Sequence, residues 1–454
     1  MPVDLNELAR ELAAELNVAG AQVAVLQDGE LSEGVAGVEN VETGLPVVPE
    51  TLMQIGSTTK MFTAALVMEH VAEGAIDLDV PVVEQLPGFA LSDEHATRTV
   101  TPRHLMSMSS GMDNGPYTDY GRGDDALARY VEALAGEPHV FPPGQGYGYS
   151  NASTCVSGRL VEHVSGNTWD EELRRRILEP AGLDNSATSA EDIIHRRFAL
   201  GHTQTPEGGL EAIHGWSLPR STAPTGGTLC TTATDLVKFA HLFLHGGRSL
   251  PGEQVLSPET VAGMQTRTTE VPYTLMADWW GLGPSGRLWD GVALWGHSGT
   301  NLGGSSYLLW APERKIAIAT TVNTPRGGYP FARRVQEVLF EERAGIRVPP
   351  RPEPPGHVEI DADRLVGTYS MHGLDFFIAA KDGGLTIAAE SVLPGVDPVI
   401  EESPLVALSP TSFLPTDSRI DGNRGYALAF VGAEDGPARH VVNGVFAMRR
   451  AAPA

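Results

Sequence analysis

The stretch Gln54-Ile55-Gly56-Ser57-Thr58-Thr59-Lys60-Met61-Phe62 places a serine three residues before a lysine. Apolar residues continue at helical spacing to about Val71, which predicts a helix beginning near Ser57. Because positions i and i+3 share one face of a helix, the Lys60 amine can reach the Ser57 hydroxyl from one turn away. A serine hydroxyl needs a base, and a desolvated lysine can be that base. Alone, the motif also fits a helix-capping serine beside an exposed lysine.

A second segment, Phe141 to Asn151, is rich in turn residues and precedes a helix that we expect over residues 152–164. It places Tyr149 and Asn151 two residues apart. A tyrosine whose phenol pKa is lowered by a neighbouring ammonium group could relay a proton to a leaving group, and an asparagine amide could hold a substrate carbonyl. The same residues also fit a packed aromatic ring followed by an Asx-type cap.

A third segment, Trp295-Gly296-His297-Ser298-Gly299-Thr300, lies in the first of three strands that we expect at 294–297, 305–310 and 316–322. A glycine in this strand lets a substrate backbone approach its edge, and His297 can bond to the Tyr149 hydroxyl or to a carboxylate. An ordinary strand histidine is the alternative. The segment does not fit a G-x-S-x-G nucleophile elbow, which needs a strand, a tight turn and a helix.

The three segments read S-T-T-K, Y-S-N and H-S-G in chain order. Together they resemble the class C branch of the serine β-lactamase and penicillin-binding-protein superfamily, which includes related esterases, D-aminopeptidases and acyltransferases. The segments at 104–111 and 226–235 support this resemblance, which covers about residues 10 to 340. It implies an α+β fold (an α/β sandwich), in which helices flank an antiparallel sheet.

The resemblance implies a role for each residue of the first two segments. Ser57 is the nucleophile that attacks the acyl carbon, and Lys60 and Tyr149 take and return protons. Asn151 binds the substrate amide. No metal or other cofactor is implied, and the sequence contains no H-E-x-x-H motif or Cys/His cluster of metal-binding spacing.

The third segment supplies the rest of the implied site. The backbone NH groups of Ser57 and Thr300, beside Gly299, form the oxyanion hole that stabilises a tetrahedral intermediate. His297 stands where the superfamily's K-T-G motif has a lysine, and it is expected to be a catalytic residue that handles protons with Lys60 and Tyr149. Because a histidine can be neutral near pH 7, strong capture of a β-lactam carboxylate is not expected.

The composition changes after residue 345. Five prolines fall between Ile346 and His357, which predicts a linker at 346–357 between a catalytic domain at 1–345 and an all-β domain at 358–454. We expect the second domain to be a small antiparallel barrel or sandwich. Such a lipocalin-like appendage resembles the penicillin-binding-protein-type thioesterases, stand-alone cyclases that release peptides from actinobacterial non-ribosomal synthetases. At its end, Arg449 and Arg450 could bind a substrate carboxylate or carbonyl.

The formal net charge of −25 disfavours nucleic acid and anionic membrane surfaces as partners. Leu5, Leu8, Leu12 and Leu16 predict an N-terminal amphipathic helix, with no basic segment followed by an apolar run as in a signal peptide. We therefore expect a cytoplasmic protein, which disfavours a secreted β-lactamase or a D,D-carboxypeptidase.

The sequence thus predicts a serine enzyme that forms an acyl-Ser57 intermediate from a small-molecule or peptidyl thioester, ester or amide. A peptide cyclase that passes the acyl group to an amine, with its substrate on a carrier protein, is favoured because an appended domain that walls the site could favour an amine over water. The alternative is an esterase or a D-aminopeptidase-type hydrolase. The acyl donor, the acceptor, the oligomeric state and the orientation of the second domain stay open.

Overall fold

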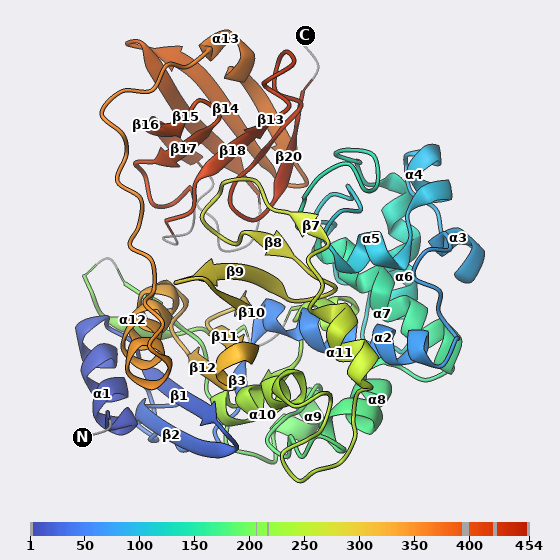
Figure 1. Ribbon diagram of the computed structural model, residues 1–454, viewed down its shortest axis with the longest axis vertical. Coiled ribbons are helices and arrows are strands. Elements are labelled where there is room, and N and C mark those ends of the chain that lie inside the picture. Colours follow the sequence, from blue (N-terminus) through green and yellow to red (C-terminus); the bar gives the residue numbers. More distant parts are fainter. Residues whose placement is uncertain (1–2, 206, 216–217, 393–398, 421–424, 452–454) are drawn as a thin grey trace.

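The computed structural model describes residues 3–205, 207–215, 218–392, 399–420 and 425–451. Figure 1 shows an antiparallel sheet with helices on both faces and, beyond one edge of it, a β-barrel. The sheet has eight strands in the order β2-β1-β12-β11-β10-β9-β8-β7. The α+β prediction and the barrel alternative for the second domain are therefore confirmed.

The strands of the first domain are β1 (Gly20–Gln27), β2 (Glu30–Gly37), β3 (Met53–Gln54), β4 (His202–Gln204), β5 (Leu210–Ala212), β6 (Cys230–Thr231), β7 (Thr269–Glu270), β8 (Trp279–Trp280), β9 (Ser285–Trp289), β10 (Val292–Thr300), β11 (Ser305–Ala311) and β12 (Ile316–Val322). The α-helices are α1 (Leu5–Glu15), α2 (Thr59–Ala72), α3 (Val82–Gln85), α4 (Glu94–Thr99), α5 (Pro102–Met106), α6 (Ala126–Ala133), α7 (Asn151–Ser165), α8 (Trp169–Leu173), α9 (Ala190–Ile193), α10 (Ala233–Leu244), α11 (Pro258–Met264), α12 (Pro325–Ala344) and α13 (Ala362–Leu365).

The central strands alternate between two apolar cores, because successive side chains of a strand point to opposite faces. In β1, Val23 and Val25 pack on the side of α1 and α12, whereas Ala24 and Leu26 pack with α2 and α10. A strand buried on both faces is apolar throughout, which is why β12 reads as Ile-Ala-Ile-Ala at its start. The sheet thus forms the middle layer of a sandwich.

The helix and the three strands predicted from residue periodicity are confirmed. Between β1 and β2, Asp28 and Gly29, both with positive φ, form a two-residue turn. The helix expected from Ser57 begins with a 3₁₀ turn at Gly56–Thr58 and continues as α2. The three expected strands lie within β10, β11 and β12, and the third has the bounds of β12.

The second domain is a closed barrel whose strands pair in chain order, with β20 returning to β13. Its strands are β13 (Gly367–Met371), β14 (Leu374–Lys381), β15 (Gly384–Ser391), β16 (Val399–Ser409), β17 (Ser412–Pro415), β18 (Leu428–Val431), β19 (His440–Val442) and β20 (Ala447–Arg450). Between α12 and α13, residues 346–361 contain no helix or strand. The Pro349 carbonyl in this segment accepts a hydrogen bond from Arg333, which holds the segment on α12.

Hydrogen bonds join the barrel to the first domain. The His372 backbone NH, at the β13–β14 turn, donates to Asp113 Oδ2 at 3.1 Å, and its ring bonds to Glu137 at 2.9 Å. The Ala427 NH donates to the Thr274 carbonyl at 2.9 Å. Figure 1 shows the barrel beside β7 and β8, whose flanking loops line the candidate site described below.

Among the helices that the structure describes, none combines the length and the apolar character needed to cross a bilayer.

Candidate active site

Ser57 and Lys60 lie on one face of the turn that starts α2. The Lys60 ammonium nitrogen Nζ is 3.1 Å from Ser57 Oγ and 3.0 Å from the Thr225 carbonyl. Ser57 is half-buried, whereas Thr58, Thr59 and Lys60 after it are buried. The hydroxyl is thus reachable by a substrate, and its base is held within hydrogen-bond distance by a carbonyl from another loop.

Burial sets the protonation of Lys60. The side chain is 1% exposed, and loss of solvation lowers its pKa well below the ordinary value. The neighbouring Cys155 gives no compensating charge, because burial raises its pKa to about 12 and keeps the thiol neutral. The lowered pKa favours the free amine of Lys60, which is the form that proton abstraction from Ser57 requires.

Tyr149, the predicted proton relay, lies next to Lys60. It directly precedes Ser150, whose side chain caps α7 by accepting from the Ser153 NH. Lys60 Nζ lies 4.8 Å from the centre of the Tyr149 ring. Cation–π attraction at this distance stabilises the protonated form of Lys60 after it has taken the serine proton.

Two aromatic side chains that the sequence analysis did not identify enclose the Tyr149 ring. Trp280 of β8 and Phe446 of the barrel each lie 5.8 Å from its centre, in edge-to-face orientation. The two come from segments far apart in the chain, and no spacing pattern in the sequence connects them with Tyr149. The contact of Phe446 with Tyr149 depends on the docking of the barrel.

Asn151, the first residue of α7, is held in one orientation. Its Oδ1 accepts from Thr225 Oγ1 at 2.6 Å, and its Nδ2 donates to the Tyr117 hydroxyl at 3.3 Å. Thr225 directly precedes the 226–235 segment that supported the resemblance, so that segment was a signal for it. Tyr117 had no such signal. The second hydrogen of the Asn151 amide is the one suited to a substrate carbonyl.

The backbones around Gly56 and Thr300 approach one another closely. A side chain at Gly56, where φ is +51°, would lie 2.8 Å from the Thr300 nitrogen, and one at Gly299 would lie 2.7 Å from the Ser57 nitrogen. Only glycines permit this approach. Beyond Gly296, β10 is no longer paired with β9. This close approach is compatible with the oxyanion hole predicted from the Ser57 and Thr300 NH groups.

His297 is neutral in this site. It is 5% exposed, and burial together with the Lys60 charge lowers its pKa to about 3. Its Nδ1 is 2.5 Å from the Ser298 carbonyl, and because a carbonyl only accepts, Nδ1 carries the proton. Nε2 is then an acceptor, and it has no hydrogen-bond partner among the described residues. It suits a hydroxyl or amide donor and not a carboxylate.

The pH profile tests this assignment. The acidic limb of kcat/KM should report deprotonation of Lys60, because His297 stays neutral down to about pH 4. We expect His297→Ala to lower kcat/KM about tenfold, through loss of one hydrogen bond, and to keep the limb. Disappearance of the limb in this variant would show that His297 is the titrating base. Folding lowers the pKa of His297 from 6.5 to about 3, so the folded state favours the neutral ring. This contribution to the free energy of unfolding is present above pH 6.5 and is lost as the pH falls towards 3.

Arg449 and Arg450 lie in β20, where the structure gives Arg450 another role. Its guanidinium donates to the carbonyls of Val366 at 2.5 Å and Arg364 at 3.0 Å, which closes the barrel beside β13. These bonds hold the group in the barrel wall, and substrate binding by Arg449 or Arg450 stays a prediction. Arg449 is exposed. The barrel's contribution to the site is Phe446, just before β20.

A half-buried serine, a desolvated lysine, a tyrosine and a glycine-lined oxyanion site define the class of protein: a serine acyl-transfer enzyme. Residues 5–340 match the Beta-lactamase family. The chain belongs to this family, within the serine β-lactamase and penicillin-binding-protein superfamily.

Two relatives illustrate the range of the similarity. Penicillin-binding protein 4 of Amycolatopsis lactamdurans is 37% identical over 366 residues, which cover 80% of this chain and 96% of the relative. Esterase EstB of Burkholderia gladioli is 29% identical, covering 70% of this chain and 89% of its own. The crystal structure of SurE aligns with a TM-score of 0.80 and 28% identity over 98% of both chains, so the similarity includes the barrel.

Proposed function

We propose that the protein is a peptide cyclase of the thioesterase type. Ser57 Oγ attacks the carbonyl of a peptidyl thioester, Lys60 takes the serine proton, and the thiol leaves with a proton returned through Lys60 and Tyr149. The amine of the same peptide then attacks the Ser57 ester. A C–N bond forms, the C–Oγ bond breaks, and the amine proton returns to Ser57. The thiol belongs to a carrier protein or a small-molecule thioester.

The observation that carries the proposal is the contact between the barrel and the catalytic tyrosine. Phe446 packs on the Tyr149 ring, and Val442 and Ala447 belong to the same buried apolar cluster as Tyr147 and Tyr149. The barrel therefore walls the catalytic group with apolar side chains. Such a wall excludes water from the space beside the acyl-enzyme.

Exclusion of water matters because the acyl-enzyme can react with either nucleophile. A well-oriented amine of the same peptide has an effective molarity that can reach about 10⁵ M, far above that of water. Aminolysis therefore wins when the site folds the peptide back onto its own ester. An apolar wall favours this compact arrangement and leaves little room for a water molecule near Ser57.

A D-residue next to the thioester is part of the proposal. A crystal structure of SurE with D-Leu aligns with this chain at a TM-score of 0.80 and 29% identity over 98% of both chains. D-Leu binding is a property of that protein. We extend it to this chain because the alignment spans both domains, and both domains form the site wall.

The test is the ratio of cyclic peptide to linear acid formed from a linear peptidyl thioester with a C-terminal D-residue. We expect cyclic peptide to predominate with the unaltered protein. Phe446→Ala should raise the fraction of acid roughly tenfold, because it opens the wall over Tyr149 to water. Phe377→Ala removes an equivalent side chain from β14, where it is 37% exposed, and is the matched control. An unchanged ratio in Phe446→Ala would contradict the role of the wall.

An ester hydrolase is the second candidate, favoured by the similarity to Esterase EstB. This function requires that every peptidyl thioester tested, with or without an added amine, gives the linear acid as its sole product. In that case Ser57, Lys60 and Tyr149 keep their roles, and water replaces the amine as the acceptor.

A further inference from the structure

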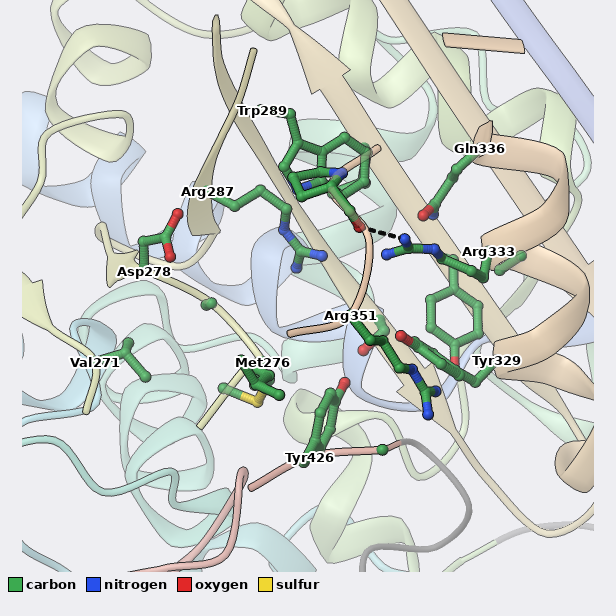
Figure 2. A pocket seen from close by; sticks show the side chains of 18 of the residues that line it. Val271, Met276, Asp278, Arg287, Trp289, Tyr329, Arg333, Gln336, Arg351 and Tyr426 are labelled. Atoms are coloured by element: carbon green, nitrogen blue, oxygen red, sulfur yellow. Dashed lines mark hydrogen bonds between the residues drawn. The ribbon is translucent and has the colours of Figure 1, made fainter. Parts of the chain in front are cut away.

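A cavity of about 430 Å³ adjoins the candidate active site on the side of His297. Its walls come from β9, β10 and β11, from α12, from the proline-rich linker and from the barrel at Gly425 and Tyr426. His297 and Ser298 belong to this lining, so the cavity is continuous with the catalytic strand. Figure 2 shows that three arginines, Arg287, Arg333 and Arg351, approach it from different segments.

Arg287, in β9, forms no ion pair among the described residues, although the more distant Asp278 carboxylate attracts its charge. Its side chain is half-buried, and its Nε is fully buried without a hydrogen-bond partner among the described residues. Its guanidinium carbon lies 5.7 Å from the centre of the Trp289 ring. In Figure 2 the guanidinium points into the cavity, towards the space between Trp289 and Tyr426.

The other charged groups of the wall are engaged elsewhere or exposed. Arg333 Nε donates to Glu337 at 2.7 Å, and its terminal nitrogen donates to the Pro349 carbonyl. The Arg351 guanidinium lies 5.6 Å from the centre of the Tyr329 ring. Asp278 is exposed, and its Oδ2 accepts from the Leu288 NH at 2.7 Å. Neither Asp278 nor another described carboxylate forms an ion pair with Arg287.

An uncompensated guanidinium in such a place is costly. Burial lowers the pKa of Arg287, which shows that its charged form is poorly solvated. A carboxylate that enters the cavity would form charge-assisted, bidentate hydrogen bonds with the planar guanidinium. The fixed positive charge also contrasts with the net charge of −25 of the whole chain. The wall therefore selects against cations and favours an anionic group.

We propose that Arg287 binds a carboxylate of the peptidyl substrate, so that the enzyme selects acyl chains with an acidic side chain near the thioester. The proposal rests on the function proposed above and names the class of its substrate. Arg287 and His297 lie on the paired strands β9 and β10, and both line this cavity. The carboxylate therefore belongs to a residue close to the reacting carbonyl, within the last few residues of the peptide. Because His297 is neutral and its Nε2 accepts hydrogen bonds, Arg287 is the residue that binds the negative charge.

The experiment compares peptidyl thioesters that carry Glu or Gln, in turn, at each of the three residues before the D-residue. At one of these three positions, the unaltered protein should prefer the Glu peptide over the Gln peptide by roughly 10- to 100-fold in kcat/KM. This is the range expected for a hydrogen-bonded charge pair. Arg287→Met should reduce this ratio to about 1, and Arg287→Lys should retain part of it. Because the readout is a ratio within each variant, a general loss of activity does not imitate the result. Arg314→Gln, which removes an exposed arginine after β11, should keep the ratio.

The outcomes separate this proposal from the proposed function. Equal rates for Glu and Gln at all three positions, with cyclic product still formed, would overturn the carboxylate site alone. Failure of every thioester to acylate Ser57 would overturn both proposals. A second pair of substrates, phosphopantetheine and pantetheine thioesters of one peptide, tests the other source of an anion. If Arg287→Met changes only this second ratio, the cavity binds the phosphate of the leaving group, and the carboxylate proposal is wrong.

Discussion

Ser57→Ala is expected to lower kcat/KM for a peptidyl thioester by about 10⁴-fold or more, since removal of the nucleophile from a coupled catalytic group abolishes the covalent route. Release of the free thiol is the measurement. The substrate should still bind, because Asn151 and the oxyanion NH groups remain in place. The variant should keep a residual acceleration of about 10³- to 10⁴-fold over the uncatalysed reaction, which binding and the oxyanion hole alone provide.

The control for this prediction is Ser92→Ala, which removes a hydroxyl outside the site that donates to the Glu137 carbonyl. It should keep normal thiol release. Thermal unfolding of Ser57→Ala should stay close to that of the unaltered protein. If Ser57→Ala releases thiol at more than about one hundredth of the normal rate with its fold intact, Ser57 is not the nucleophile.

Tyr149→Phe is expected to cost about 10²- to 10⁴-fold in kcat, because one hydroxyl used for proton transfer is lost while the ring remains. The ring keeps its contacts with Trp280 and Phe446, so the cluster beneath the barrel should not loosen. The ring also stays 4.8 Å from Lys60 Nζ. The effect should therefore appear in kcat and not in the thermal unfolding midpoint.

Tyr120→Phe is the matched control for this variant. Tyr120 packs edge-to-face on Tyr130, in the loop before α6, and lies outside the catalytic group. It should leave kcat within about twofold of normal, the range of changes away from the site. A near-normal kcat in Tyr149→Phe would instead remove this tyrosine from the mechanism and leave Lys60 to serve both proton transfers.

The sequence alone predicted which candidate site residues lie close together when they belong to the same local element. Ser57 and Lys60 share a helix turn, so their spacing fixed their separation before any tertiary structure was known. Tyr149 and Asn151 likewise flank one helix start. Thr225, which accepts a hydrogen bond from Lys60 and donates one to Asn151, lies in a 3₁₀ helix (Arg220–Thr225) far from both in the sequence. Contacts of that kind follow from packing, which no spacing pattern encodes.

The barrel shows the same limit. Its prediction depended on the proline-rich linker and on the all-β pattern of the residues after it. Strand β16, which carries Pro404 and a register shift in its pairing with β15, has no clear alternation and was not predicted. Whether Arg449 or Arg450 binds substrate stays a prediction, and the bonds of Arg450 to the barrel backbone had no signal in the sequence. Phe446, whose ring contacts Tyr149, had no local signal.

The most direct test of the central claim is intact-protein mass spectrometry during turnover of a linear peptidyl thioester, with the released products weighed in the same reaction. The account predicts a transient adduct with the mass of the peptidyl acyl group, located at Ser57 by fragmentation. Its decay should coincide with the appearance of a cyclic peptide one water lighter than the linear acid. An adduct on another residue, or a Ser57 adduct that decays only to the linear acid, would contradict it.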